Sequence, residues 1–294
     1  MLRPATPDDR TALIALGLAE DAAWSDAAAV SAEEAGEYLD GCEPGVILEE
    51  EGRVAGYAAT GEAGRTILLV DPEDDPGPAL EVLVGWLAGR GHHEADSYGR
   101  DTRRIAWFEA NGFTHRRSFF DLRRDIDPAP APAAFPGEVE LARFRPGEDD
   151  EAVHALIYVD AAWTEVPGHS ARSLESWRSA LSPEDRGWIA RRDGRAVGWV
   201  CGRTFADGRG WIAQLAVARS ARGQGLGRAL LLHAMADLRD RGATSLALGV
   251  QGANENAVGL YRDVGFEIER EWRAYARPAP ESPGSGDAAA GAGR

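Results

Sequence analysis

One stretch of sequence decides the fold: Trp211-Ile212-Ala213-Gln214-Leu215-Ala216-Val217, followed by Arg222-Gly223-Gln224-Gly225-Leu226-Gly227-Arg228. Its first part is short and mostly apolar, which predicts a strand buried on both faces. The glycines predict a turn. The apolar residues after it recur with helical spacing until Gly242, which predicts a helix over residues 226–241. The stretch is therefore expected to form a strand, a glycine-rich turn and a helix.

A turn of this kind can bind phosphate. The first N–H groups of a helix have no partner within the helix, and the helix dipole is positive at that end. Gly223, Gly225 and Gly227 allow the backbone to approach a pyrophosphate closely, while Arg222 and Arg228 add positive charge beside it. We therefore expect a phosphorylated ligand here, with a glycine-rich turn that binds nothing as the alternative.

Two other phosphate-binding motifs do not fit the spacing. The dinucleotide fingerprint Gly-x-Gly-x-x-Gly, begun at Gly223, needs a glycine where the chain has Arg228. The P-loop needs Gly-Lys, and the chain contains no lysine. The pattern that remains is Arg-x-x-Gly-x-Gly after a buried strand.

A second block follows the predicted helix and reads Asn254-Glu255-Asn256-Ala257-Val258-Gly259-Leu260-Tyr261-Arg262-Asp263-Val264-Gly265-Phe266. Together and in this order, the two blocks resemble the GNAT superfamily of acetyl-CoA-dependent N-acetyltransferases. The resemblance implies that acetyl-CoA is the acetyl donor. It also implies that a neutral amine attacks the acetyl carbonyl directly, without a metal or a covalent enzyme intermediate.

The resemblance further implies a role for each matching residue. The backbone of Leu215, Ala216 and Val217 would bind the pantetheine arm, because two parallel strands part at this point. The pyrophosphate would lie on the turn, which comprises Arg222, Gly223, Gln224, Gly225, Leu226, Gly227 and Arg228. Asn254 would hydrogen-bond the pantetheine arm from the other side. Tyr261 would lie near the thioester sulfur and protonate the departing thiolate.

The general base is the least specified part of the site. Many family members carry Glu on the central strand, four residues before the position of Leu215, where this chain has Trp211. Gln214 is expected to face the other side of the strand. A helix predicted over residues 149–163 and the segment after it would line the acceptor site. They offer Asp160, Glu165, His154 and His169, of which Glu165 is the expected base.

The two halves of the chain repeat one another. Asp21-Ala22-Ala23-Trp24 returns as Asp160-Ala161-Ala162-Trp163, residues 47–57 parallel residues 189–199, and Asn111-Gly112-Phe113 parallels Val264-Gly265-Phe266. A proline-rich segment, DIDPAPAPAAFPG, separates the halves. We therefore predict an α/β protein with two tandem GNAT-like domains, each a mixed central sheet flanked by helices. The predicted ranges are 1–124 and 139–277 for the domains, 125–138 for the linker and 278–294 for a disordered tail.

The first copy lacks the features that would bind the cofactor. Its loop reads Val70-Asp71-Pro72-Glu73-Asp74-Asp75-Pro76-Gly77-Pro78, with acids where the phosphates would lie. Phe108 takes the position of Tyr261, and Asp101 takes that of Asn254. We predict a degenerate copy that completes the acceptor cleft or stabilises the second half.

These observations predict an N-acetyltransferase that acts on a primary amine of a small molecule or peptide. The tandem order also resembles the mycothiol synthase family, which acetylates a cysteinyl amine on an amino-sugar inositol. That family uses a Glu on the central strand and a lysine, which this chain lacks. A non-catalytic acyl-CoA-binding or sensing module stays open because of Trp211. The tryptophans indicate a partly apolar acceptor pocket: Trp163, Trp177, Trp188, Trp199 and Trp211.

Composition limits the partners and the compartment. A formal net charge of -16 would repel nucleic acid and anionic lipid surfaces. The chain has no apolar run long enough to span a bilayer and no signal peptide at its start. Cys42 and Cys201 lack the spacing of metal ligands. We therefore expect a cytoplasmic protein without a metal that binds neither nucleic acid nor membranes, as a monomer or a homodimer.

Overall fold

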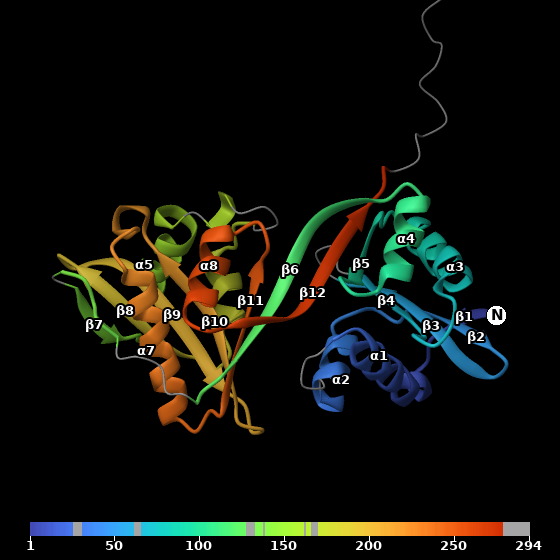
Figure 1. Cartoon of the computed structure of the whole chain (residues 1–294), viewed down its shortest axis with the longest axis horizontal. Coiled ribbons are helices and arrows are strands. Elements are labelled where there is room, and N and C mark those ends of the chain that lie inside the picture. Colours follow the sequence, from blue (N-terminus) through green and yellow to red (C-terminus); the bar gives the residue numbers. More distant parts are fainter. Residues whose placement is uncertain are drawn as a thin grey trace, which may run out of the picture. The chain divides into compact units, whose positions relative to one another are not determined.

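The computed structural model describes residues 1–25, 31–61, 66–127, 133–137, 139–161, 163–165 and 170–278. The chain divides into two compact units (Figure 1). Unit 1 comprises Met1–Arg116 and Arg273–Arg294, and unit 2 comprises Arg117–Trp272. These units are defined by contacts, so the ranges predicted for the two sequence copies stay predictions. Residues 128–132 and 138 of the predicted linker, and 279–294 of the predicted tail, lie outside the described residues.

Unit 2 contains a mixed sheet in the order β12-β6-β11-β10-β9-β8-β7. The strands are β6 (Thr114–Asp125), β7 (Glu140–Arg143), β8 (Arg186–Arg192), β9 (Arg195–Thr204), β10 (Arg209–Val217), β11 (Ser245–Gln251) and β12 (Glu267–Ala276). The main helices are α5 (Asp150–Ala155), α6 (Leu174–Ser179), α7 (Leu226–Asp240) and α8 (Glu255–Asp263). From β6 to β7 the neighbouring strands are antiparallel, except that β10 and β11 are parallel.

The strand, turn and helix predicted over residues 211–241 are confirmed by β10, the loop after it and α7. The helix predicted over residues 149–163 is confirmed over residues 150–160, but it is not α-helical throughout and ends earlier. The α-helix ends at Ala155, and the chain continues as a π-helix over Leu156–Asp160. In this widened turn the Ala161 N–H donates to the Leu156 carbonyl at 2.6 Å.

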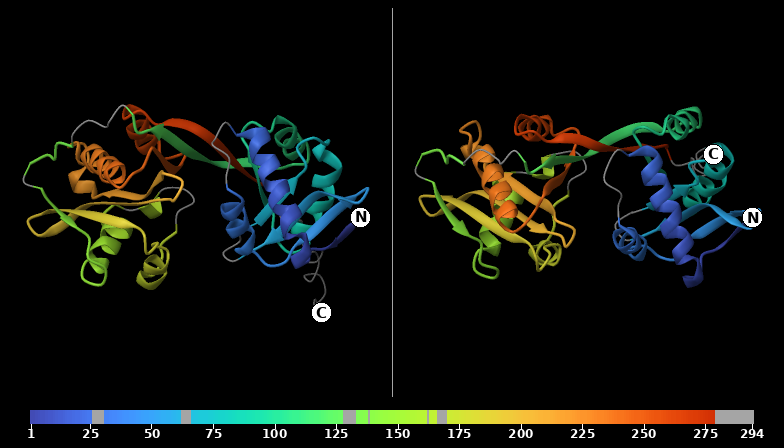
Figure 2. Two further views of the ribbon diagram at one scale, coloured as in Figure 1. Left: turned by 90° about the horizontal axis from the view of Figure 1, so that it is seen from below. Right: turned by 60° about the horizontal axis from the view of Figure 1, so that its bottom comes forward.

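Helices cover both faces of the unit 2 sheet, because alternate residues of a strand point to opposite sides. At Gly198 on β9 a side chain would collide with Leu230 of α7, so α7 packs directly on this face. The next residue, Trp199, is 1% exposed and points to the other face, with its ring 6.4 Å from that of Trp177 on α6. The layers are visible in the left view of Figure 2.

Unit 1 has the same order of elements as unit 2. Its sheet runs β1-β2-β3-β4. The elements are β1 (Leu2–Pro4), α1 (Arg10–Trp24), α2 (Ala32–Asp40), β2 (Val46–Glu50), β3 (Arg53–Thr60), β4 (Thr66–Val70), α3 (Pro76–Ala88), β5 (Glu94–Tyr98) and α4 (Thr102–Ala110). The parallel segments 47–57 and 189–199 each lie in an antiparallel hairpin, β2–β3 in unit 1 and β8–β9 in unit 2.

Each unit contains a strand segment from the other half of the sequence. Residues 117–125 of β6 belong to unit 2, where Leu122 is fully buried in the core. Residues 273–276 of β12 belong to unit 1, where the ring of Tyr275 lies 5.3 Å from that of Phe108. Both segments are therefore part of a hydrophobic core and not connectors.

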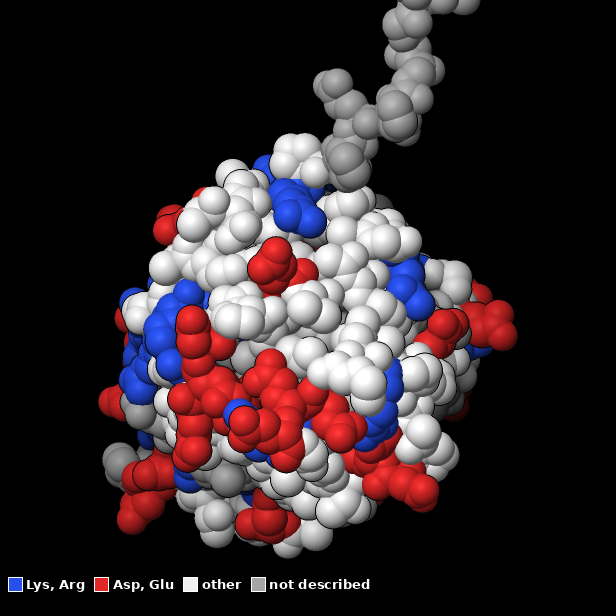
Figure 3. All heavy atoms as spheres, turned by 90° about the vertical axis from the view of Figure 1, so that its right-hand side faces the viewer, with Lys and Arg blue, Asp and Glu red and all other residues white. Residues whose placement is uncertain are grey.

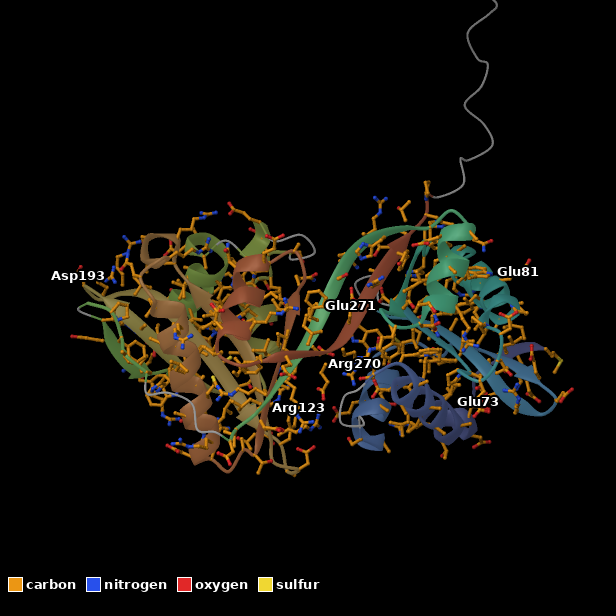
Figure 4. All side chains as sticks on the ribbon, in the orientation of Figure 1. Glu73, Glu81, Arg123, Asp193, Arg270 and Glu271 are labelled. Atoms are coloured by element: carbon orange, nitrogen blue, oxygen red, sulfur yellow. The ribbon has the colours of Figure 1, made fainter. Side chains whose placement is uncertain are left out.

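Polar contacts join β6 and β12 within unit 2. Arg270 pairs with Asp121 at 3.0 Å, and the Ser118 hydroxyl donates to Glu271 at 2.9 Å. A weaker pair joins Arg123 and Glu269 at 3.5 Å. Figure 4 labels Arg123, Arg270 and Glu271 on these two strands. The polar side chains pair across the strands, which supports their register.

Acidic side chains dominate part of the surface. Figure 3 shows one face on which Asp and Glu form a continuous band. An acidic surface repels the phosphates of a nucleic acid. That the protein has no nucleic-acid partner stays a prediction. Within the described ranges, none of the helices is both long and apolar enough to cross a membrane.

Candidate active site

The parallel strands β10 and β11 part in the middle of unit 2. Their pairing runs from Arg209↔Ser245 to Trp211↔Ala247 and ends there. Beyond this point β10 pairs only with β9, up to Val217↔Gly198, and β11 pairs only with β6, up to Gln251↔Phe119. Among the described residues, the backbone N–H and C=O groups on the inner edges of both strands thus pair with no other strand. This is the opening in which Leu215, Ala216 and Val217 were expected to bind an extended arm.

The turn at the end of this opening has the backbone of an anion site. Gly223 and Gly225 have φ of 72° and 82°, in the left-handed region that favours glycine. Gly225 is the N-cap of α7, and no side chain caps this helix. A side-chain Cβ at either glycine would meet nothing within 4 Å. The first N–H groups of α7 are therefore open to a ligand with negative charge.

Gly227 holds the turn against both neighbouring elements. A Cβ at Gly227 would lie 3.6 Å from Val217 at the end of β10 and 3.5 Å from Leu260 on α8. This close packing places the start of α7 between the end of β10 and the helix that carries Tyr261. The sequence motif and the second block thus meet at one place.

The polar side chains of the turn bind the protein itself. Arg222 donates to the Ala161 carbonyl at 2.6 Å, and Arg228 donates to the Asp263 carbonyl at 3.5 Å. Gln224 donates to the Ser220 carbonyl at 3.1 Å. The side chains thus hold the loop in shape, and the backbone N–H groups of the turn are the donors that an anion could use. Their predicted role in binding pyrophosphate stays a prediction.

Tyr261 is held rigidly on α8. Its side chain is 8% exposed, and its ring packs edge-on against Phe266 with the centroids 6.2 Å apart. Burial raises the pKa of Tyr261 to about 12. The hydroxyl therefore keeps its proton at neutral pH, as a proton donor to a leaving thiolate must.

Asn254 begins the same helix. Its Oδ1 accepts from the Ala257 N–H at 3.3 Å, so the side chain is the N-cap of α8. This bond uses the oxygen, and the described residues offer no partner for its Nδ2. Its expected bond to a pantetheine arm stays a prediction that uses Nδ2.

A pocket with a volume of about 350 Å³ is lined in part by Trp211, Ala213 and Gln214 of β10. Its walls are Tyr158, Trp163, Ser170, Arg172, Ala180, Leu181, Asp185, Arg203, Trp211, Ala213 and Gln214. Trp211, where the β10–β11 pairing ends, is one of its residues, so the pocket adjoins the opening between the strands. The partly apolar pocket expected from the tryptophans includes Trp163 and Trp211. Trp188 packs elsewhere, with its ring 4.4 Å from that of His233.

The expectation that Gln214 faces away from this side is wrong. The β9–β10 pairing shifts between Ile212 and Gln214, which makes Ala213 the extra residue of a β-bulge. The bulge resets the alternation of the strand, so Gln214 points to the same face as Trp211. Sequence reasoning missed this residue because nothing in the residue types marks the bulge.

The candidate bases that the structure describes are not among the residues that line this pocket. Glu165 is largely exposed and forms an ion pair with Arg219. His154 hydrogen-bonds the Arg172 carbonyl at 2.8 Å through Nε2. Asp160 ends the π-helix, and His169 lies outside the described residues. Glu165 therefore stays a prediction, with its carboxylate held by a guanidinium. The described residues contain no group of three or more His, Cys, Asp or Glu that could hold a metal ion.

In unit 1 a side chain caps the start of α3, the helix that corresponds to α7. Asp75 is the N-cap of α3, and its carboxylate accepts from the Gly77 N–H at 3.2 Å. Asp71 and Asp74 both pair with Arg53. The acids predicted to repel phosphate thus include one that takes the N–H group which a phosphate would need.

A buried ion pair lies beside β4 in unit 1. Arg104 lies on α4, donates to the Leu68 carbonyl at 3.2 Å and pairs with Glu20. Glu20 in turn accepts from the N–H of Val70, the last residue of β4, at 3.3 Å. The position of Arg104 in α8 is taken by Ala257, three residues after the N-cap in both helices. Side chains thus bond the strand end that unit 2 leaves open.

We expect Arg104→Ala to destabilise unit 1 by about 3–5 kcal/mol, because Glu20 would stay buried without its partner. Urea unfolding of the full chain measures this loss. Arg103→Ala on the same helix is the control. Arg103 is exposed and donates to the carbonyls of Pro72 and Asp74, so its loss is expected to cost about 1 kcal/mol. Equal losses for the two variants would show that the buried pair is not important for stability.

Comparison with known proteins agrees with this geometry. A family model described as "Acetyltransferase (GNAT) family" matches residues 151–266. Mycothiol acetyltransferase of Thermomonospora curvata is 30% identical over 291 residues, which cover 90% of this chain and 93% of that protein. The chain belongs to the GNAT acetyltransferase family. It is an acyltransferase, as the two sequence motifs predicted.

Two solved structures share the fold over the whole chain. A GCN5-related N-acetyltransferase from Sphaerobacter thermophilus superposes with a TM-score of 0.77 at 23% identity, covering 95% of this chain and 96% of that one. A tandem GNAT protein from the clavulanic acid biosynthesis pathway gives 0.70 at 20% identity, covering 96% and 99%. The predicted fold of two tandem GNAT domains is thus confirmed.

Proposed function

We propose that unit 2 transfers an acetyl group from acetyl-CoA to a primary amine of a small molecule or peptide. The observation that carries the proposal is the point where β10 and β11 part. From there one opening leads along β10 to the uncapped start of α7, and the pocket begins at Trp211. A long phosphorylated thioester and an amine can therefore meet at the same residues.

Different parts of unit 2 bind acetyl-CoA and take part in the reaction. The first N–H groups of α7 bind the pyrophosphate, and the free backbone edge of β10 binds the pantetheine arm. The acceptor amine attacks the acetyl carbonyl, and the bond to sulfur breaks. The hydroxyl of Tyr261 donates its proton to the leaving thiolate, so that neutral CoA thiol is released. The attacking nitrogen loses one proton to water, and Tyr261 takes one proton back from water. The amine must reach the carbonyl in its neutral form.

A second candidate acceptor is favoured by the relatives. The protein from Thermomonospora curvata is named a mycothiol acetyltransferase and aligns with 90% of this chain. The amine would then be a cysteinyl amine on an amino-sugar inositol. The chain has no lysine and carries Trp211 in place of the central-strand Glu, so we propose that other residues would bind such an acceptor.

Release of free thiol from acetyl-CoA tests the proposal. The native chain is mixed with acetyl-CoA and a panel of amines that includes amino acids, amino sugars, short peptides and the cysteinyl amino-sugar inositol. We expect amine-dependent thiol release with at least one class. Tight binding of CoA without thiol release for any amine would instead support a non-catalytic acyl-CoA-binding module.

We expect one CoA to bind per chain, in unit 2. In unit 1 the start of α3 is capped by Asp75, and Arg104 and Glu20 bond backbone groups of β4. Isothermal titration calorimetry with CoA gives the stoichiometry directly. A second binding event of similar affinity would show that the first copy has kept its site.

A further inference from the structure

Two buried indoles fix the orientation of Gln214. Trp177 and Trp199 are each 1% exposed, and their Nε1–H groups donate to Gln214 Oε1 at 3.2 and 2.9 Å. An indole N–H can only donate, so both bonds require the amide oxygen and not the amide nitrogen. The side chain therefore cannot turn over without leaving two buried donors unpaired, which is costly.

The opposite end of the amide belongs to the pocket wall. Gln214 lines the pocket, and its oxygen faces the two indoles behind it. Its Nε2 forms no hydrogen bond with any residue that the structure describes. The amide N–H groups are thus donors that a molecule in the pocket can use.

Two other polar side chains of the wall, Asp185 and Arg203, form an ion pair with one another. Asp185 accepts from Arg203 at 3.3 Å and from the Ser182 N–H at 2.9 Å. Trp211 and Ala213, next to Gln214 on β10, present apolar surface to the pocket. A donor fixed in an apolar part of a pocket favours a ligand with an oxygen at that point and disfavours one without it.

We propose that Gln214 selects acceptor amines that carry a hydroxyl or carbonyl oxygen, by donating an Nε2–H bond to that oxygen. Trp177 and Trp199 are positioning residues that hold the amide in the required orientation. This inference rests on the proposed function, because it takes the pocket as the acceptor site. It narrows the acceptors from amines in general to oxygen-bearing amines.

A matched pair of small amines tests the selection by equilibrium binding. Trans-2-aminocyclohexanol and cyclohexylamine differ by one hydroxyl group, and calorimetry measures the affinity of each for the native chain in the presence of CoA. We expect the amino alcohol to bind about tenfold more tightly, in line with one hydrogen bond. Equal binding of the two amines, or binding of neither, would overturn the proposal.

Three variants locate the effect. Gln214→Glu still accepts both indole bonds but has no donor for the ligand, so the tenfold preference is expected to disappear. Trp177→Phe releases one of the two bonds to Oε1 and is expected to reduce the preference several-fold. Trp188→Phe changes an indole outside the pocket and is the control, with the preference unchanged. A preference that survives in Gln214→Glu would contradict the assignment.

Failure of the proposed role of Gln214 can be distinguished from failure of the proposed acetyl transfer. If the amino alcohol is preferred but no amine is acetylated, the binding site is real and the transfer reaction is not. If amines are acetylated with the same affinity and rate whether or not they carry an oxygen, the reaction stands and the role of Gln214 is refuted.

Discussion

Tyr261→Phe is expected to lower kcat by about 100-fold or more, because general acid catalysis typically contributes at least this factor. The affinity for acetyl-CoA is expected to stay within about twofold. The ring would keep its packing against Phe266, and only the hydroxyl is lost. Steady-state kinetics with a saturating amine, together with calorimetry for CoA, separates the two effects.

The pH dependence follows from the same side chain. An acid acts in its protonated form, which is present below its pKa. Since burial raises the pKa of Tyr261 to about 12, its ionisation should not reduce kcat until the pH approaches that value. Any decline in kcat of the native chain at lower alkaline pH must then come from another group, and Tyr261→Phe should keep that decline.

Tyr275→Phe is the matched control for this prediction. Tyr275 is buried in unit 1, where it packs near Phe108, and it takes no part in the proposed reaction. Its loss of a hydroxyl should leave kcat unchanged. A normal kcat in Tyr261→Phe, or an equal decrease in both variants, would remove Tyr261 from the mechanism.

Gly225→Asp is expected to weaken CoA binding by about 100-fold or more. The new carboxylate would stand at the N-cap of α7, where it repels the diphosphate and can accept from the N–H groups that the phosphates need. At an effective dielectric constant near 20, two charges about 4 Å apart repel by about 4 kcal/mol. Unit 1 already shows this arrangement, in which Asp75 caps α3.

Gly225→Asn separates charge from backbone strain. Both side chains have the same size, and both must adopt a positive φ of 82°. The amide has no charge, so we expect a loss of CoA affinity of about tenfold or less, since strain at such a position costs about 1–2 kcal/mol. Calorimetry on both variants measures the difference. Similar affinities for Asp and Asn would mean that the anion does not bind at the start of α7.

The glycine turn and the helix after it could be predicted from the sequence because local residue types determine their backbone. Glycines at 223 and 225 identify the positive φ, and the apolar spacing after Leu226 identifies the helix whose first N–H groups are open. The block from Asn254 to Phe266 likewise marks a capped helix that ends in a glycine turn. Local residue types determine these features, so no tertiary information was needed.

The pocket beside β10 could not be predicted in the same way. Which face of β10 bears Gln214 depends on the bulge at Ala213, and a bulge is set by the pairing with β9. The bond from the Arg222 guanidinium to the Ala161 carbonyl joins residues that are distant in sequence, so it also depends on tertiary packing. Tertiary packing also decides that residues 117–125 of β6 belong to unit 2 and that residues 273–276 of β12 belong to unit 1.

The structural differences between the first copy and the second could be predicted only in part. The acids of its loop and the change from Tyr261 to Phe108 indicate the loss of cofactor binding. The burial of Arg104 and Glu20 beside β4 was not foreseen, because the two residues lie on α4 and α1, far apart in the sequence. Such a pair is visible only once the helices are placed on the sheet.

A single-turnover experiment tests the central claim most directly. The native chain is loaded with one equivalent of acetyl-CoA and mixed with the cysteinyl amino-sugar inositol and, in parallel, with an amino alcohol. Mass spectrometry of the quenched mixture then counts the amide product and the free CoA. We predict one N-acetylated amine for each CoA released, with at least one of the two acceptors. Full retention of acetyl-CoA with both amines, despite tight binding, would contradict acetyl transfer by this chain.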